Sequence, residues 1–518
     1  MKDQLALLPG FLTAHLQLTL VALGLGAAIS VPLGVAVTRR RRLEPGVLGF
    51  ASVIQTVPSL ALLAIMVPAL AALGAVTSRA FGIELRSIGY LPAIVALTLY
   101  SMLPILRNTV AGIEGVDPAL VEAARGVGMT PRQRLLQVEL PLALPVIVAG
   151  LRTATVWVVG TATLSTPVGA TSLGNFIFSG LQTRSFDAVL VGCIAAALLA
   201  ILLDQLIRGL EVGLVARRRG LVAGAGAVLL GLTAYTGLSF AAERLGGAPA
   251  PVRIGAKAFT EQYVLGEIMA RQVTEQTGIP TEAVSSLGST VAFDAVRTGE
   301  IDVYADYSGT IWATLMKRAR LPARREDVLR EVETWLAATH GILVVGAFGF
   351  ENTYALGMRG EQARSLGLSD ISDLARVASR LEIGGDLEFF ARAEWRSLVD
   401  AYGLAFRARR SMDPALMYQA VAAGEVDVIS AFSTDGRIAA YDLVLLADDR
   451  GVIPPYDTIM LASPRLVRER PEVVAALRGL AGRVDEAAMQ RMNLAVDRDG
   501  RSPADVAMEF LAGQRAGR

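Results

Sequence analysis

The chain has 518 residues, 53% of them hydrophobic, and a mean hydropathy of +0.47. Its apolar residues crowd into positions 1–241, whereas the rest has the composition of a soluble α/β chain. A membrane part followed by a soluble part is therefore the first inference. The net charge of +1 provides no global field that would recruit nucleic acid. The single cysteine, Cys193, excludes an internal disulfide, and the two histidines lie far apart without neighbouring cysteines, so no metal site is expected.

Six stretches are long and apolar enough to cross a bilayer, which takes about 20 apolar residues of helix. They cover roughly residues Leu12–Val37, Val47–Gly74, Ile88–Leu106, Leu142–Leu164, Ala188–Ile207 and Leu221–Phe240. We therefore expect an all-α domain that crosses the membrane six times.

Basic residues predict the orientation of these spans. Arg39–Arg42 follow the first span, the loop 107–141 carries several arginines, and Arg217–Arg219 follow the fifth span. All three clusters fall on one side, which the positive-inside rule assigns to the cytoplasm. We therefore expect a multi-pass protein of the cytoplasmic (inner) membrane, with the N-terminus and everything after the sixth span outside. No cleavable signal peptide is expected, because the N-terminus lacks its features and the sixth span delivers the rest of the chain.

Strands alternate with helices from Val252 onward, after a short Gly/Pro/Ala linker. Within this region residues 295–307 resemble residues 421–432: each combines the end of a helix, a Gly-Glu turn and an Ile/Val-Asp-Val strand. The repetition favours two similar α/β lobes joined by a hinge, with a cleft for a small molecule. The alternative is that this short pattern recurs by chance in α/β proteins.

The loop between the third and fourth spans contains Glu122-Ala123-Ala124-Arg125-Gly126-Val127-Gly128, followed by Val138-Glu139-Leu140-Pro141. Glu122 and Arg125 are three residues apart and share a helix face. Gly128 permits a sharp turn, and Pro141 suits the start of the next span. An ordinary helical hairpin is the alternative interpretation.

This spacing resembles the EAA loop of ABC importer permeases, in which the loop forms a short coupling helix that docks on the ATPase. The resemblance implies a permease domain over residues 1–220 with the coupling loop at 117–141. Residues 221–251 then hold the sixth span and the linker. It also implies that two permease copies pair as a homodimer.

The chain contains no G-x-x-x-x-G-K-[ST] loop, so we do not expect it to hydrolyse ATP or to be an enzyme. A separate ATPase subunit is implied, which carries ATP and Mg²⁺. No cofactor is expected in this chain.

Three permease segments, Gln55–Ala61, Leu99–Thr109 and Gly126–Thr130, resemble the osmoprotectant (glycine betaine/carnitine/choline) branch of these importers. Residues 252–518 resemble the binding proteins of the same family. The motifs that carry this second resemblance are Gly255–Gln262, Tyr304–Thr310, Asn352–Ala355, Glu388–Arg392, Met412–Tyr418 and Ser433–Ile438. It implies a two-lobed periplasmic-binding-protein fold of type II, with crossovers between the lobes near 345–352 and 448–458.

A quaternary ammonium group has no N–H to donate, so it is held by electrostatics and by aromatic faces. A betaine also carries a carboxylate, which cationic and hydroxyl side chains bind. The resemblance places seven residues at the ligand: Tyr307, Tyr354, Tyr418 and Tyr441 as aromatic candidates, and Lys257, Arg392 and Thr310 as carboxylate partners. Glu261, Asn352 and Asp435 are further candidates for orienting these groups.

Each of these side chains also has a purely structural interpretation. A lone tyrosine is more often half-buried in a core, and Tyr418 lies on an amphipathic helix that buries either it or Met417. Lys257 is either solvated or part of an anion site before a helix. Arg392 has the alternative of pairing with Glu388. Asn108, Arg152 and Asp204 are polar residues within the spans, where ionisable groups often have a function. The structural alternative places Arg152 near a helix-packing seam and Asp204 near the cytoplasmic end of the fifth span.

The sequence therefore predicts the permease and binding component of an ATP-driven importer for trimethylammonium solutes such as glycine betaine, choline, carnitine or ergothioneine. The expected partners are an ATPase subunit, a second permease copy, the solute and the lipid bilayer, but not nucleic acid. An importer for another small amino-acid derivative is the alternative. A membrane-anchored receptor is disfavoured by the EAA loop, and an extracytoplasmic enzyme by the lack of a nucleophile with its acid and base.

Overall fold

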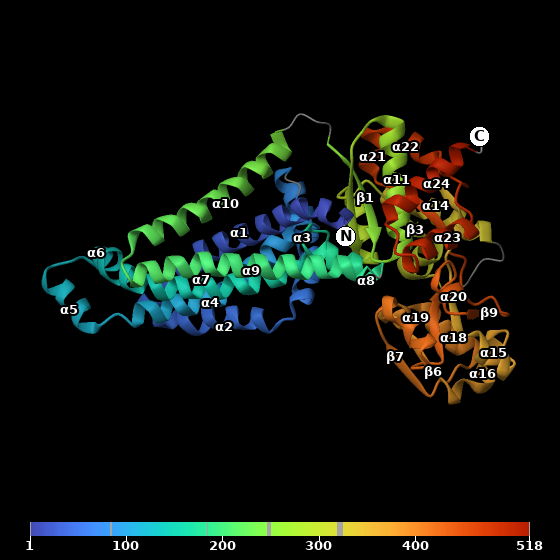
Figure 1. Ribbon diagram of the computed structural model, residues 1–518, viewed down its shortest axis with the longest axis horizontal. Coiled ribbons are helices and arrows are strands. Elements are labelled where there is room, and N and C mark those ends of the chain that lie inside the picture. Colours follow the sequence, from blue (N-terminus) through green and yellow to red (C-terminus); the bar gives the residue numbers. More distant parts are fainter. Residues whose placement is uncertain (1, 83–84, 184, 246–249, 319–324, 517–518) are drawn as a thin grey trace. The chain divides into compact units, whose positions relative to one another are not determined.

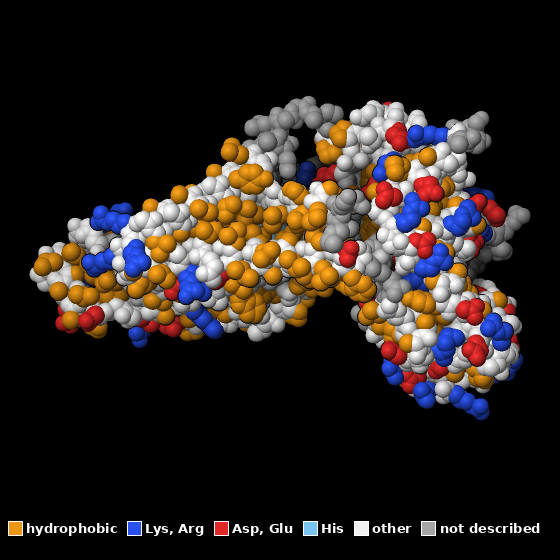
Figure 2. All heavy atoms as spheres, viewed as in Figure 1, with side chains coloured by type: hydrophobic (Ala, Val, Ile, Leu, Met, Phe, Trp, Pro, Cys, Tyr) orange, Lys and Arg blue, Asp and Glu red, His pale blue; other side chains and the backbone are white. Residues whose placement is uncertain are grey.

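The computed structural model describes residues 2–82, 85–183, 185–245, 250–318 and 325–516. Two compact units divide the chain, one made of Met1–Phe178 and Asp187–Ala248, the other of Ser179–Phe186 and Pro249–Arg518. Hydrophobic side chains cover the visible surface of the first unit, whereas charged side chains are scattered over the second (Figure 2). This difference matches the predicted division into a membrane part and a soluble part.

The first unit is entirely helical (Figure 1). Its helices are α1 (Lys2–Arg39), α2 (Glu44–Thr56), α3 (Ser59–Phe81), α4 (Tyr90–Glu114), α5 (Pro118–Gly126), α6 (Pro131–Arg134), α7 (Leu140–Ala162), α8 (Gly174–Gln182), α9 (Phe186–Val215) and α10 (Arg219–Leu245). Helix α4 packs against both α1 and α7 and carries the most buried face. Within the described residues, α1, α4, α7, α9 and α10 contain segments long and apolar enough to cross a membrane, and α2 with α3 forms a sixth candidate.

The predicted span Val47–Gly74 is not one straight helix. Helices α2 and α3 meet at an angle of 106°. The bend follows from Pro58, which disfavours helical backbone at the residue before it, and Val57 is extended with ψ 128°. The hydroxyl of Tyr100 donates to the backbone oxygen of Val57, and the Gln55 side chain donates to the oxygen of Tyr100, so α4 holds the bend in place.

The loop after α4 forms the short helices α5 and α6. Asp117 caps α5 by accepting a hydrogen bond from the backbone of Ala119 at 2.9 Å. Gly128 has φ +81°, a left-handed conformation that glycine adopts without strain. Thr130 and Gln133 cap α6 reciprocally, and a π-helical turn (Leu135–Glu139) leads into α7.

The second unit contains two five-stranded mixed sheets, one in each lobe. The first-lobe sheet has the order β2-β1-β3-β10-β4, with β1 (Val252–Lys257), β2 (Thr281–Leu287), β3 (Val303–Tyr307), β4 (Leu343–Glu351) and β10 (Asp457–Ala462). The second-lobe sheet has the order β7-β6-β8-β5-β9, with β5 (Tyr354–Arg359), β6 (Glu382–Gly385), β7 (Ala408–Ser411), β8 (Val428–Phe432) and β9 (Leu443–Leu446). The chain passes between lobes after β4 and again between β9 and β10. The predicted two-lobed fold is confirmed.

Helices cover both sheets. Those of the first lobe include α11 (Thr260–Thr277), α12 (Ser289–Thr298), α13 (Ser308–Thr310), α14 (Arg325–His340), α21 (Pro464–Glu469), α22 (Pro471–Arg478), α23 (Glu486–Asp497) and α24 (Pro503–Ala516). Between the crossovers lie α15 (Gly360–Leu366), α16 (Ile371–Val377), α17 (Leu387–Ala391), α18 (Ala393–Tyr402), α19 (Pro414–Ala422) and α20 (Arg437–Ala440). Each lobe has its own buried hydrophobic core, which the apolar faces of these helices complete.

The two repeated segments fold alike. Gly299 and Gly424 each have positive φ at the end of a helix, and an aspartate follows three residues later. Asp302 accepts a 2.8 Å hydrogen bond from the first strand of its sheet, and Asp427 accepts one of the same length from β6. The repetition therefore marks equivalent turns that attach a central strand to its parallel neighbour. Each strand ends in an aromatic residue at the lobe junction.

Candidate ligand-binding site

Aromatic side chains from both lobes meet where β3, β5 and β8 have their ends. The ring of Phe259 stacks on that of Tyr307, with centroids 6.2 Å apart, and on that of Phe432 at 5.9 Å. Tyr354 lies 5.0 Å from Phe432 and 5.8 Å, edge to face, from Tyr456. We call Phe259, Tyr307, Tyr354, Phe432 and Tyr456 the aromatic cluster. Phe259 and Phe432 are partly exposed, whereas the three tyrosines are buried.

A buried carboxylate, Glu261, organises one side of this cluster. It accepts hydrogen bonds from the hydroxyl of Tyr307 at 2.7 Å and from the side-chain amide of Asn352 at 3.0 Å. Its other oxygen accepts from Thr434 and, at 3.3 Å, from Asn493. Burial raises the pKa of Glu261 above its ordinary value, and these hydrogen bonds oppose the rise. Glu261 and Asn352 therefore fix the position of the Tyr307 ring.

Lys257 ends β1 beneath the same ring. Its Nζ lies 2.5 Å from Asp306 Oδ1 and 5.3 Å from the centroid of Tyr307. The pair is almost fully buried, with Lys257 4% and Asp306 1% exposed. The parallel pairing of β1 with β3 brings the two residues together. Lys257 is thus neither solvated nor free to move, and its charge is already balanced.

Arg392 lies on the other side of Tyr354, with its guanidinium carbon 5.2 Å from the ring centroid. It is ion-paired with Glu388 at 2.5 Å and with Glu394 at 3.4 Å, so the Glu388 pair considered from sequence is present. It also contacts Thr314 of the first lobe at 3.4 Å. Arg392 Nε and Glu394 Oε2 are buried without a hydrogen-bond partner among the described residues.

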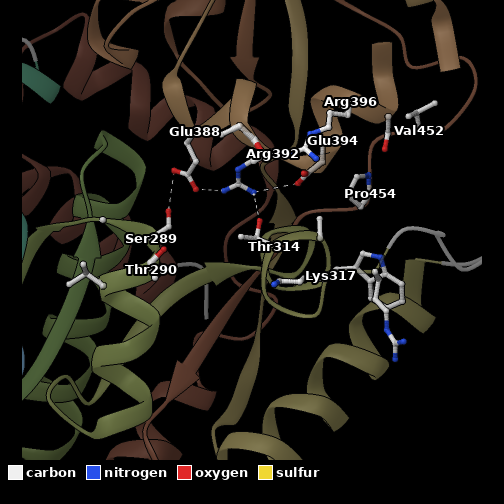
Figure 3. Close-up of a pocket in the computed structure, with 17 residues that line it drawn as sticks. Ser289, Thr290, Thr314, Lys317, Glu388, Arg392, Glu394, Arg396, Val452 and Pro454 are labelled. Atoms are coloured by element: carbon white, nitrogen blue, oxygen red, sulfur yellow. Dashed lines mark hydrogen bonds and ion pairs between the residues drawn. The ribbon is translucent and has the colours of Figure 1, made fainter. Parts of the chain in front are cut away.

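A cavity of about 850 Å³ opens beside Arg392, between the two lobes (Figure 3). Ser289 and Thr290, at the start of α12, line it from the first lobe, and Ser289 donates to Glu388 at 3.3 Å. Lys317 and Arg396 add further positive charge to its wall. The cavity and the aromatic cluster share Arg392 as their common boundary. Thr310, also buried, belongs to the short helix that precedes this wall.

Tyr418, Tyr441 and Asp435 lie in a neighbouring cluster of the second lobe. Tyr418 is fully buried, and its hydroxyl accepts a 2.9 Å hydrogen bond from the backbone of Phe432. The Arg437 guanidinium covers its ring at 4.0 Å and forms an ion pair with Asp435 at 2.6 Å. Tyr441 is partly exposed and packs against the same cluster. These residues pack behind Phe432, on the second-lobe side of the aromatic cluster.

Sequence reasoning did not single out Phe259, Phe432 or Tyr456. The internal repetition contains a signal for one of them, because Phe432 occupies the position in β8 that Tyr307 occupies in β3. Phe259 lies within the Gly255–Gln262 motif, in which only Lys257 and Glu261 are predicted to act at the ligand. Tyr456 has no sequence signal, since it lies in the second crossover and reaches the cluster only through the return of β10 to the first sheet.

Comparisons with known proteins agree with this architecture. Residues 250–513 match the substrate-binding domain of the ABC-type glycine betaine transport system, and residues 26–216 match the inner-membrane component of binding-protein-dependent transport systems. The chain belongs to this ABC importer family. It therefore combines the permease and the binding component, neither of which is the catalytic subunit, and a separate ATPase partner is implied.

Relatives cover either the whole fusion or one half of it. The chain is 29% identical over 469 residues to the ergothioneine transport permease/ergothioneine binding protein of Helicobacter pylori (strain G27), covering 88% of this chain and 81% of that protein. It is 42% identical over 193 residues to the glycine betaine/carnitine/choline transport system permease protein of Bacillus subtilis (strain 168), covering 37% and 82%. It is 30% identical over 272 residues to the carnitine transport binding protein of Listeria monocytogenes, covering 50% and 85%.

Proposed function

We propose that this importer carries trimethylammonium solutes of the betaine type, and that the aromatic cluster holds the trimethylammonium head. The observation that carries the proposal is the meeting of ring faces from both lobes beside buried carboxylates. Glu261, Asp306 and Asp386 are each at most 5% exposed near these rings. Two cations lie beside the same rings, Lys257 paired with Asp306 and Arg392 paired with Glu388 and Glu394, so carboxylates remain in excess. Excess negative charge and ring faces are what a quaternary ammonium requires.

The cavity beside Arg392 has the opposite character. Lys317, Arg318, Arg392 and Arg396 line it with Glu388 and Glu394, so cations outnumber carboxylates. The N-terminus of α12 adds backbone N–H groups and hydroxyls on the facing wall. A zwitterion whose cationic head lies among the rings has its carboxylate directed into this cavity. Lys257, whose charge Asp306 balances, and Thr310 are buried at the first-lobe side and do not line this cavity, so we assign them to the ligand site only as its first-lobe wall.

The names of the relatives support the same solute class. Glycine betaine, carnitine, choline and ergothioneine share the trimethylammonium group and differ in the remainder. Three of the four carry a carboxylate, and the basic cavity favours these over choline. Tyr418, Tyr441 and Asp435 are assigned to the site through their support of Phe432.

For the membrane part, we propose that two copies pair and that the loop 117–141 docks on the ATPase through Glu122, Ala123, Ala124 and Gly128, with Pro141 starting the next span. The loop and the arginines at 39–42 and 217–219 are assigned to the cytoplasm, and the binding domain (252–518) to the outside. In the predicted topology these basic segments all lie on the same side of the membrane, which supports this orientation.

The test is calorimetric titration of the full-length chain in detergent with glycine betaine, choline, carnitine and ergothioneine, and with histidine and proline as unmethylated controls. We expect at least one trimethylammonium ligand to bind and Tyr354→Ala to weaken it at least tenfold. Arg392→Lys is expected to weaken glycine betaine more than choline. No binding of any methylated ligand by a folded chain would refute the proposed solute class.

A further inference from the structure

Three charged side chains of the membrane part meet between α7 and α9. Arg152 Nε lies 2.6 Å from Asp204 Oδ1, and its Nη1 lies 3.1 Å from Glu211 Oε2. Two carboxylates thus face one guanidinium. Arg152 is 12 residues after the start of α7 and 10 before its end, about 18 Å and about 15 Å along the helix. On α9 the two carboxylates lie closer to the helix end, because Asp204 and Glu211 are 11 and 4 residues before Val215.

This group is not sealed inside the helix bundle. The side chains of Arg152, Asp204 and Glu211 are 32%, 18% and 26% exposed. A cavity of about 410 Å³ adjoins them, lined by Ala149, Arg152, Thr153, Val156, Trp157 and Asp204. Trp157 is 58% exposed at this cavity, so one face of its indole is available to a ligand.

The outward face of α9 provides the contrast. Leu190, Ile194, Leu198 and Ile201 are between 56% and 61% exposed there, as a lipid-facing surface requires. Charged groups on membrane-spanning helices are costly in contact with lipid and usually face the bundle interior or a cavity. A purely structural interpretation accounts for the ion pairs of Arg152 with Asp204 and Glu211. It does not account for the cavity beside them, which Trp157 also lines.

We propose that this cavity is a transit site for the quaternary ammonium head of the solute during its passage through the membrane. Trp157 presents the strongest of the natural cation–π faces, and the two carboxylates of Asp204 and Glu211 outnumber the one guanidinium that pairs with both. Arg152 offsets part of that charge, which keeps binding weak enough for release. The proposal rests on the proposed function for the identity of the solute, but its site lies in the other unit and can be tested by itself.

The deciding experiment uses tetramethylammonium as the probe and the fluorescence of Trp157 as the signal. The full-length chain and its Trp157→Phe variant are titrated in detergent with tetramethylammonium chloride and, as a control for ionic strength, sodium chloride. The difference between the two proteins reports Trp157 alone, because the three other tryptophans are common to both. We expect a saturable change with tetramethylammonium but not with sodium, and a midpoint at least threefold higher in Asp204→Asn. Equal responses to the two salts would overturn the proposal.

Transport provides a second readout. Uptake of radiolabelled glycine betaine and choline is measured in cells that make the chain with its ATPase. We expect Trp157→Leu to lower uptake at least tenfold, Trp157→Phe to keep at least half of it, and Leu198→Ala on the lipid-facing side of α9 to leave it unchanged. Calorimetric affinity at the aromatic cluster stays within twofold in all of them. Full uptake in Trp157→Leu contradicts the transit site, whereas absent calorimetric binding in the parent contradicts the proposed solute class and leaves the fluorescence result standing.

Discussion

The ring of Phe259 lies nearly parallel to the ring of Phe432, with an interplanar angle of 3° and centroids 5.9 Å apart. Phe259 follows β1 of the first lobe, and Phe432 ends β8 of the second, so this contact joins the lobes directly. A cation can bind against these two ring faces only when the lobes separate to admit it. On the proposed function, this pair would link ligand binding to lobe closure.

Replacing either ring with alanine should weaken binding of a trimethylammonium ligand about tenfold, since a desolvated cation–π contact contributes on the order of 1–2 kcal/mol. Phe432→Tyr keeps the ring face and should bind within about threefold of the parent. Calorimetry on the full-length chain measures both effects. Phe81→Ala, which removes an exposed ring from α3, serves as the control. Unchanged affinity in both Phe259→Ala and Phe432→Ala would show that the head group binds elsewhere.

Glu261 should give the binding domain a measurable pH dependence. Burial raises its pKa in the folded state, so the folded domain holds this proton more tightly than the unfolded chain does. The resulting stabilisation is fully present below the ordinary glutamate pKa, about 4.3, and is lost as the pH rises through the folded value. The melting temperature should therefore fall over that window.

Glu261→Gln should make the melting temperature fall less as the pH rises. Some of the fall should remain, because burial also raises the pKa of Glu267, Glu351 and Asp386. At neutral pH we expect a cost of about 1–3 kcal/mol, since an amide cannot accept from all four donors that surround the carboxylate. Melting followed by tryptophan fluorescence suits the experiment, because three of the four tryptophans lie in the binding domain. Identical pH profiles for parent and variant would contradict the assignment.

Sequence patterns predicted the parts of the fold that depend on local chemistry. The Gly-Glu turns before β3 and β8 were visible because glycine and aspartate are required there for backbone reasons. Pro58 lies within a predicted span, but a span is predicted from mean hydropathy over many residues. That mean does not report a change in helix direction, so the break at Val57 was not predicted. The Lys257–Asp306 pair could not be foreseen, because it depends on which strands become neighbours. The same applies to Tyr418, whose ring Arg437 covers after a turn that no spacing predicts.

The loop proposed to dock on the ATPase exposes apolar side chains. Val127 is 75% and Leu120 48% exposed, whereas Ala124 turns inward. Val127→Asp should reduce co-purification of the ATPase at least fivefold, because it places a charge in an apolar contact. Val215→Asp, at the similarly exposed end of α9, is the matched control. Equal recovery of the ATPase with both variants would remove Val127 from the contact.

Glu139 connects this loop to the first helix of the permease. It is 3% exposed, lies 2.8 Å from Arg134 and also pairs with Arg39 at the end of α1. The π-helical turn that contains it joins α6 to α7, and such turns frequently occur at functional positions. We therefore expect a movement of the loop to reach α1 and α7 together.

Glu139→Gln should uncouple ATP hydrolysis by the ATPase from the binding of solute to this chain. It leaves two arginines without their buried partner, and breaking a buried pair costs about 3–5 kcal/mol. With the chain reconstituted beside its ATPase, we expect basal ATP hydrolysis to persist and solute-stimulated hydrolysis to fall at least fivefold. The exposed pair of Arg41 and Glu114, 3.7 Å apart, provides the control, because Glu114→Gln removes a solvent-screened contact in the same region. If both variants retain full stimulation, the loop acts through other contacts, and α7 moves independently of α1.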